Sequence, residues 1–141
     1  MTDITDYKFD QIDLGLKKEF TVKITESMIA DFAKISGDYN PLHMDEKYAK
    51  STTFKNRICH GMLLAIFFSR LIGMHLPGKH ALYFSQSLNF QSPCFVNDVI
   101  TIKGEVIDKS VATRLITIKT SIYNQERTCL LDGVAKVVVR K

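Results

Sequence analysis

The pattern of apolar and polar positions first predicts a short amphipathic helix over residues 26–36. Its apolar residues recur at the three- and four-residue spacing of one helix face. Thr25 precedes the segment and is a suitable N-cap, and Glu26 suits the positive end of the helix. Gly37 follows it and tolerates the positive φ of a helix stop. The apolar positions of this face are Met28, Ile29, Phe32 and Ile35.

A second helix is predicted over residues 61–73, with the sequence GMLLAIFFSRLIG. A glycine stands at each end, and only Ser69 and Arg70 interrupt the apolar residues between them. A helix that is apolar on nearly all sides must be buried by other elements. We therefore expect this helix at the centre of the fold.

The remaining regular segments alternate between apolar and polar residues and predict strands. The links between the later strands are short and polar, which favours antiparallel pairing of neighbours. One buried helix and a sheet of about five strands predict an α+β domain in which the sheet wraps around the helix. We expect a single domain over residues 1–141, with residues 1–12 peripheral. The predicted strands cover residues 14–22, 81–91, 98–107, 113–123 and 129–140.

Residues 38–60 show little regular periodicity, although residues 46–50 are compatible with one helical turn. The Asn40-Pro41 step stops any continuing helix, because the residue before proline avoids the α region. An irregular segment of this length in a small domain is usually functional or disordered.

Composition and charge narrow the class of protein. The chain has 141 residues, of which 45% are hydrophobic and 24% charged, as in ordinary globular proteins. No apolar run approaches the roughly 18 residues of a membrane span, and no secretory leader is visible. Three widely spaced cysteines, Cys59, Cys94 and Cys129, fit a reducing compartment, so we expect a cytoplasmic protein. The net charge of +4 is scattered, which disfavours nucleic acid as a partner and suits a small anionic substrate.

The residues with the most chemical potential are Asp38 and His43, which flank Pro41. A proline turn can bring a carboxylate and an imidazole together, and such a pair can hold a water and move its protons. The ordinary alternative is that Asp38 caps a turn and His43 packs in a loop. From the pair alone, this alternative is favoured.

The start of the buried helix carries a second candidate site, His60-Gly61-Met62. The first turn of a helix has unpaired N–H groups, and Gly61 leaves room for a ligand oxygen that becomes negative during a reaction. His60 either touches substrate or fixes the loop, and the structural role is favoured. Ser69 lies two turns further along the helix. The four histidines form no recognised metal-ligand spacing, so no metal site is predicted.

The segment from residue 31 to residue 63 resembles the signature of the MaoC-like R-specific enoyl-CoA hydratases. The similarity continues through the later strands and covers about residues 14–139. The matching positions are Ser36-Gly37-Asp38, Asn40-Pro41-Leu42-His43, Asp45, Phe54 and His60-Gly61-Met62.

This resemblance implies a hot-dog fold and a homodimer or higher homo-oligomer. It implies reversible hydration of a trans-2-enoyl-CoA to an (R)-3-hydroxyacyl-CoA, without a cofactor, since coenzyme A is part of the substrate. By resemblance, Asp38 and His43 are the catalytic pair and Gly61 N–H binds the thioester oxygen. Ser69 and His60 are assigned to the substrate site, and Asn40 and Pro41 position the loop. Lys55, Arg57 and Lys79 are candidates for the CoA phosphates, and Leu64, Phe68 and Leu82 for the acyl wall.

Three other functions remain open on this sequence. The first is a (3R)-hydroxyacyl dehydratase that acts on acyl carrier protein, which has the same catalytic pair. The second is a hot-dog thioesterase, which releases a free thiol. The third is a non-catalytic module that binds acyl thioesters, against which the presence of both Asp38 and His43 argues.

Overall fold

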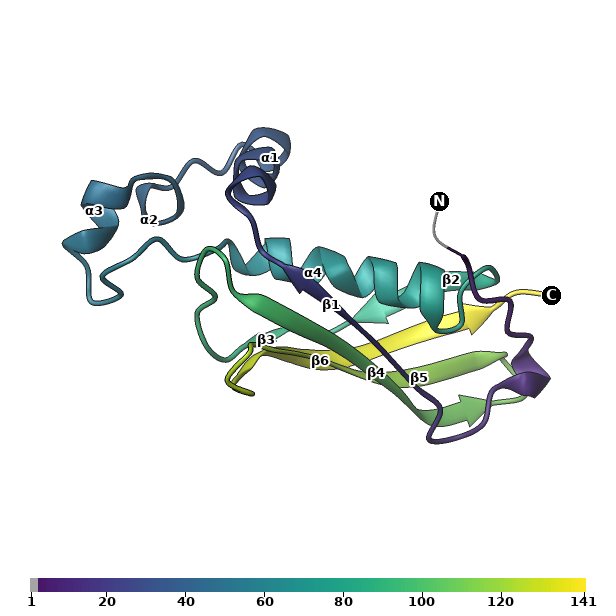
Figure 1. The fold of residues 1–141 in the computed structure, drawn as a ribbon. Helices are drawn as coiled ribbons and strands as arrows, with labels where there is room; N and C mark the ends of the chain where they lie inside the picture. The colour runs from purple at the N-terminus through teal and green to yellow at the C-terminus, as the bar shows by residue number, and fades with distance from the viewer. Residues whose placement is uncertain (1–2) are drawn as a thin grey trace.

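The computed structural model describes residues 3–141 and contains a six-stranded antiparallel sheet packed on one long helix (Figure 1). The strand order is β1-β4-β5-β6-β2, and the short β3 also pairs with β6. The expected α+β architecture is confirmed, with six strands in place of about five. The strands are β1 (Lys17–Lys23), β2 (Ala81–Gln86), β3 (Asn89–Phe90), β4 (Val99–Ser110), β5 (Leu115–Tyr123) and β6 (Cys129–Val139).

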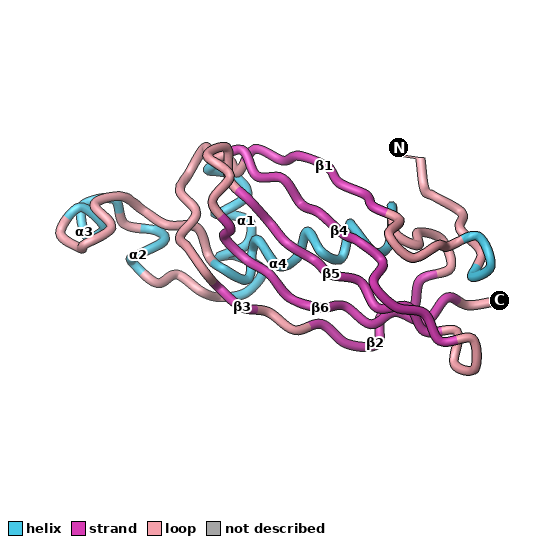
Figure 2. The backbone as a smooth tube through the Cα atoms, turned by 90° about the horizontal axis from the view of Figure 1, so that it is seen from below, coloured by secondary structure: helices cyan, strands magenta, loops and turns pink. Residues whose placement is uncertain are grey.

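The sixth strand arises because the predicted strand over residues 81–91 is broken in two. The register against β6 shifts by one residue between Tyr83 and Ser85, within β2, and an extra residue of this kind bends a strand locally. Ladder pairing then stops after Gln86 and resumes in the same register at Asn89, so the break falls at residues 87–88. Both pieces lie along the same edge of the sheet, beside β6 (Figure 2).

The long helix α4 (Gly61–Arg70) continues through a π-helical turn, Leu71–His75, and lies along one face of the sheet (Figure 1). Its inner face is buried, as its apolar sequence predicts, by residues such as Leu64 and Phe68. One stripe on α4 stays open within this chain, because Met62 and Ile66 are each about half exposed. No helix among residues 3–141 is long and apolar enough to cross a bilayer.

Three shorter helices gather beyond one end of α4, while the chain termini lie at the other end (Figure 1). The first, α1 (Glu26–Ser36), has the predicted bounds. The Thr25 hydroxyl accepts a hydrogen bond from Met28 N–H at 3.2 Å, and Gly37 ends the helix with φ +79°. The other two, α2 (Pro41–Met44) and α3 (Glu46–Lys50), fold much of the irregular segment against α1 and each other.

At the opposite end of α4, the N-terminal segment completes the core. Phe9 lies in a short 3-10 turn, Phe9–Gln11, and both Phe9 and Ile12 are buried. They pack in one cluster with Ile72 and Leu76. This contrasts with the peripheral position expected for residues 1–12, of which Met1 and Thr2 lie outside the described residues. The three-residue spacing of Phe9 and Ile12 explains why both side chains reach the same core.

Candidate active site

The turn after α1 is built by short polar side chains that bond to nearby backbone groups. Gly37 reverses the chain, and the Asp38 carboxylate oxygen Oδ1 then accepts a hydrogen bond from Asn40 N–H at 3.1 Å. Asn40 Oδ1 in turn accepts from Leu42 N–H at 3.0 Å and caps α2. Pro41 occupies the first helical position, where its missing N–H has no partner to lose. These contacts leave Asp38 exposed, with Oδ2 free of protein partners in the described residues.

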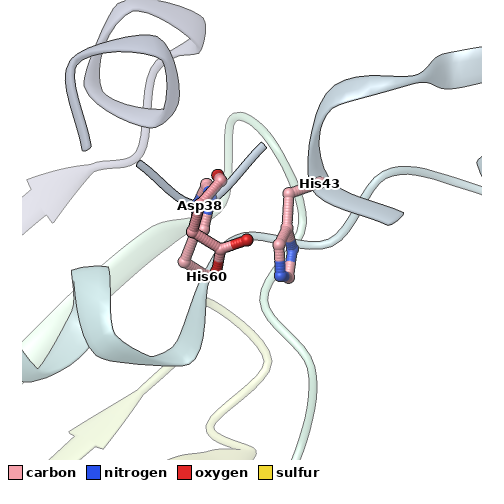
Figure 3. Close-up of side chains that lie close together, drawn as sticks. All are labelled: Asp38, His43 and His60. Carbon is pink, nitrogen blue, oxygen red and sulfur yellow. The ribbon is translucent and has the colours of Figure 1, made fainter. Parts of the chain in front are cut away.

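The single turn of α2 presents His43 to the Asp38 carboxylate (Figure 3). His43 Nδ1 lies 2.8 Å from the Ile58 carbonyl oxygen. A carbonyl oxygen only accepts, so Nδ1 carries the proton in the neutral ring. The other ring nitrogen, Nε2, is therefore an acceptor and is available as a base.

His60 is a buried residue that contacts both members of this pair. It is 2% exposed, and its Nε2–H donates to the backbone carbonyl of Asp38 at 3.0 Å. Its ring stacks against His43, with ring centroids 4.1 Å apart, and against Phe32 on α1 at 4.7 Å. The position of His60 thus links the turn that carries Asp38 to the ring of His43.

Asp38, His43 and His60 form one cluster, in which one polar atom of each residue lies within 4.8 Å of the others. A carboxylate and two imidazoles can ligate a metal ion, and each ring bonds a backbone carbonyl through one nitrogen and keeps the other free. The open groups are the Asp38 carboxylate, His43 Nε2 and His60 Nδ1, which is buried. Two acceptors in such proximity can orient one water by accepting its two hydrogens, which leaves an oxygen lone pair free to attack.

Gly61 opens α4 and lies beside this cluster in the sequence and in the cavity. No acceptor among residues 3–141 pairs with its N–H, as expected for the first residue of a helix. A side chain at Gly61 would be crowded, because a Cβ there would lie 2.7 Å from the ring of Phe90. The glycine therefore allows the aromatic ring to approach the helix start and keeps the N–H accessible.

His43 and Gly61 line the same cavity of about 490 Å³. Its wall is mainly apolar and comes from α4, β3, β6 and the loops on either side of β3 and α4. A mostly apolar pocket with a few convergent polar groups is the usual form of a small-molecule site. The other lining residues are Phe54, Ile58, Cys59, Met62, Leu64, Phe90, Gln91, Ser92, Pro93, Cys94 and Leu130.

Arg57 has a different position from the one that the sequence suggested. Its guanidinium makes two hydrogen bonds to the Glu26 carboxylate, at 2.8 and 3.0 Å, and Nε donates to the His43 carbonyl at 2.6 Å. With its donors committed to α1 and α2, Arg57 is a positioning residue for His43 and is not free for a CoA phosphate. Sequence reasoning missed this pairing, because Glu26 was explained fully as a favourable charge in the first turn of its helix.

Several other expected site residues lie away from the cavity. Ser69 is exposed on the open stripe of α4, and Leu82 is exposed on the edge strand β2. Phe68 belongs to the core, and Lys79 lies beyond the far end of α4. The structure thus clusters Asp38, His43 and His60 and places His43 and Gly61 in the cavity wall, with Asp38 and His60 outside the lining. Ser69 and Leu82 lie outside the site of this single chain. The helical period explains why Ser69 does not face the cavity. It lies eight residues after Gly61, and eight residues are more than two full turns, so the two residues point in different directions.

Comparison with known proteins identifies the family. Residues 8–126 match the family described as MaoC like domain. The chain is 39% identical over 126 residues to an (R)-specific enoyl-CoA hydratase of Aeromonas caviae, which covers 89% of this chain and 94% of that protein. It is also 34% identical over 114 residues to a mitochondrial 3-hydroxyacyl-[acyl-carrier-protein] dehydratase of Arabidopsis thaliana, covering 79% and 68% of the two chains.

Among solved structures, the unliganded R-hydratase from Pseudomonas aeruginosa superposes with a TM-score of 0.94 and is 33% identical. The match covers 99% of this chain and 90% of that one. The chain belongs to the MaoC-like dehydratase family, which confirms the resemblance seen in its sequence. It is a hydro-lyase of the enoyl-CoA hydratase/3-hydroxyacyl dehydratase kind.

Proposed function

We propose that this protein is an R-specific enoyl-CoA hydratase, which reversibly adds water to a trans-2-enoyl-CoA to give an (R)-3-hydroxyacyl-CoA. The observation that carries the proposal is that His43, which clusters with the Asp38 carboxylate, lines the same apolar cavity as Gly61, whose N–H is free. The choice of CoA and of the R product follows the relatives of 38–39% identity whose names specify both.

In this mechanism the water donates its two hydrogens to the Asp38 carboxylate and to His43 Nε2. Its oxygen attacks the β-carbon of the enoyl group, one member of the pair takes a water proton, and a proton is delivered to the α-carbon. The pair returns to its starting state, so no net proton is gained or lost. General acid–base catalysis of this kind contributes about 10²–10⁴-fold in rate.

Attack at the β-carbon pushes electrons onto the thioester oxygen, which becomes enolate-like. The N–H of Gly61 and the positive end of α4 suit this developing charge. A donor aimed at charge that appears only in the transition state lowers the barrier more than it strengthens substrate binding. His60 and Arg57 act through the geometry of Asp38 and His43 and do not themselves touch the reacting atoms.

The active form in this proposal is a homodimer joined along the β2 edge. Within residues 3–141, β2 pairs only with β6, so its outer edge is free. Leu82 and Phe84 are 56% and 71% exposed on β2, and Met62 and Ile66 on α4 are further exposed apolar residues. A free apolar edge strand is a template for pairing with a second copy. Light scattering during size-exclusion chromatography tests this, and Phe84→Lys is expected to shift the protein towards monomer.

The test of the activity is the loss of enoyl absorbance from crotonyl-CoA, followed by chiral analysis of the 3-hydroxybutyryl product. We expect a single R enantiomer and no free thiol. Release of free thiol would identify a thioesterase instead. Binding of crotonyl-CoA without turnover would identify a non-catalytic module, and either result overturns the proposal.

A dehydratase acting on acyl carrier protein is the second candidate, supported by the similarity to the Arabidopsis thaliana protein. The two functions share the chemistry and differ in the carrier. Turnover of a crotonyl group on CoA and on acyl carrier protein, compared as kcat/KM, separates them. The proposed function requires the higher value for CoA.

A further inference from the structure

Two of the three cysteines, Cys59 and Cys94, face each other in the wall of the cavity. Both are buried, with exposed fractions of 4% and 2%, and both line the cavity shared by His43 and Gly61. We propose that Cys59 and Cys94 form a redox-sensitive dithiol, which a hydroperoxide closes to a disulfide and which thereby lowers the activity of the enzyme. The closure itself is independent of the proposed function, whereas its effect on activity rests on that function.

The backbone holds the two residues in opposed positions. Ile58 and Phe95 form an antiparallel bridge, so Cys59 and Cys94 are the next directly opposed pair. Cys59 N–H donates to the Cys94 carbonyl at 2.7 Å. Opposed residues in an antiparallel pair have Cα atoms roughly 4.5–5.5 Å apart, which lies within the range that a disulfide spans. The bridge can therefore close without unfolding of either segment.

The two sulfurs are close enough to affect each other's protonation. The neighbouring Cys59 thiol, and after it burial, raise the pKa of Cys94 far above its ordinary value. Cys94 is thus held as a thiol in the untreated protein. Access is limited to reagents small enough to enter the cavity, which favours hydrogen peroxide as the oxidant.

The reaction balances without any further reagent. One thiol of the pair attacks one peroxide oxygen, the O–O bond breaks, and the products are a sulfenic acid and one water. The other thiol then attacks the sulfenic sulfur, its proton leaves with the displaced oxygen as a second water, and the S–S bond forms. Two thiols are oxidised by two electrons, and one peroxide is reduced to two waters.

Closure would disturb the site because Cys59 directly precedes His60 and Gly61. Opposed Cβ atoms in a strand pair are roughly 4.5–5.5 Å apart, whereas a disulfide holds them at about 3.8 Å, so the segments must move together by up to about 1 Å. This movement shifts the N–H of Gly61 and the ring that bonds the Asp38 carbonyl. Since a misplacement of about 1 Å can cost 10²-fold, we expect at least a tenfold loss of hydration rate.

The experiment uses the wild-type protein treated with hydrogen peroxide, then denatured and alkylated with iodoacetamide. Peptide mapping should find Cys59 and Cys94 joined, lighter by two hydrogens and unalkylated, and Cys129 alkylated. Crotonyl-CoA hydration should fall at least tenfold and recover with dithiothreitol. Absence of the Cys59–Cys94 crosslink overturns the proposal whether or not the protein hydrates crotonyl-CoA, so its failure is distinguishable from failure of the proposed function.

Two matched variants test whether the Cys59–Cys94 pair causes the loss of activity. Cys129 is half-buried and outside the cavity lining, so Cys129→Ser should lose and regain activity like the wild type. Cys94→Ser cannot form the disulfide, so peroxide should lower its activity, relative to its own untreated value, much less than that of the wild type. If Cys94→Ser loses activity reversibly to the same extent, or if the crosslinked wild type is fully active, the proposal is wrong. The mapping of the wild type needs no variant, so a Cys94→Ser protein that fails to fold does not remove the test.

Discussion

The two ends of α4 are built from similar apolar residues, yet one end is hollow and the other is filled. At the C-terminal end, Phe9 and Ile12 from the N-terminal segment pack on Ile72 and Leu76 and close the core. At the N-terminal end, the core stops at a cavity of about 490 Å³, with His43 and Gly61 in its wall. The site therefore lies where packing between the helix and the sheet is left incomplete.

The polar groups at the two ends are also held in different ways. At the open end, backbone carbonyls hold the rings: the Ile58 carbonyl bonds His43 and the Asp38 carbonyl bonds His60. At the filled end, His75 packs on Phe20, and neither of its ring nitrogens bonds another group in the described part of the chain, whereas His60 lacks a partner only at Nδ1. A ring fixed by its backbone bond keeps one nitrogen ready for chemistry, whereas a ring that only fills space gains nothing from being charged.

The largest effect should come from removing either member of the acceptor pair at the open end. Asp38→Asn and His43→Gln keep the size of each side chain but remove its ability to take a proton. We expect each to lower kcat for crotonyl-CoA hydration by about 10²–10⁴-fold. Both residues lie outside the packed core, so the thermal midpoint should stay close to that of the wild type. A folded variant with near wild-type kcat would contradict the mechanism.

The next largest effect should come from the donor at the helix start. Gly61→Pro removes the N–H but suits the first position of a helix, and the extended φ and ψ of His60 are compatible with a following proline. Gly61→Ala keeps the N–H and introduces the same crowding against Phe90. We expect kcat of the proline variant to be about 10²-fold below that of the alanine variant. Equal values for the two would exclude Gly61 N–H as the oxyanion donor.

At the filled end, a truncation should affect stability and not chemistry. Ile118 is fully buried in the cluster with Ile12 and Leu76, and Ile118→Ala should lower the free energy of unfolding by about 3 kcal/mol. Urea unfolding measures this, and kcat/KM per folded molecule should stay within about twofold of wild type. Leu64→Ala, at the cavity wall, is the contrasting variant, and it should also change KM. A similar change in KM for Ile118→Ala and Leu64→Ala would mean that packing at the filled end affects substrate binding at the open end.

A smaller effect should follow from loosening the support of His43. Glu26→Gln removes the charge that holds Arg57, whose Nε–H bonds the His43 carbonyl. We expect kcat to fall about three- to tenfold with KM unchanged, because His43 is less well positioned. The ion pair is partly exposed and adds little to stability. Glu46→Gln is the control, because Glu46 lies nearby and makes no ion pair in the described residues; an equal loss there would argue against positioning.

Much of the fold could be predicted from the sequence, because the signals that set helix ends and the buried faces of strands act over a few neighbouring residues. The caps of Thr25 and Gly37 set both ends of α1 at the predicted residues. The alternation of Ile100, Ile102 and Val106 sets the buried face of β4. The break between β2 and β3 was missed, because residues 81–91 alternate as one strand should, and the loss of pairing at residues 87–88 depends on the partner strand β6.

The candidate site was predictable only in part, for the same reason. Asp38 and His43 were found because a proline turn joins them within one short segment. The bonds that make them a site come from distant segments: His60 reaches the Asp38 carbonyl, and Arg57 reaches Glu26. Such pairings depend on how the loop packs on α1 and α4, which no local pattern specifies.

The smallest effect, and the one that most sharpens the contrast between the two ends, concerns His75. Burial, and then the charges of Arg70 and Lys18, lower the pKa of His75 below its ordinary value of 6.5. The unfolded chain therefore binds more protons than the folded one as the pH falls below about 6.5, so folding stability is lost as the pH drops through the folded pKa of His75. His75→Gln cannot titrate and should show a smaller drop in the urea midpoint between pH 7.5 and pH 5.5. Arg70→Gln removes one positive charge near His75 and should make the drop in the urea midpoint partly smaller. Identical drops in the wild type and both variants would show that the folded protein does not disfavour protonation of His75.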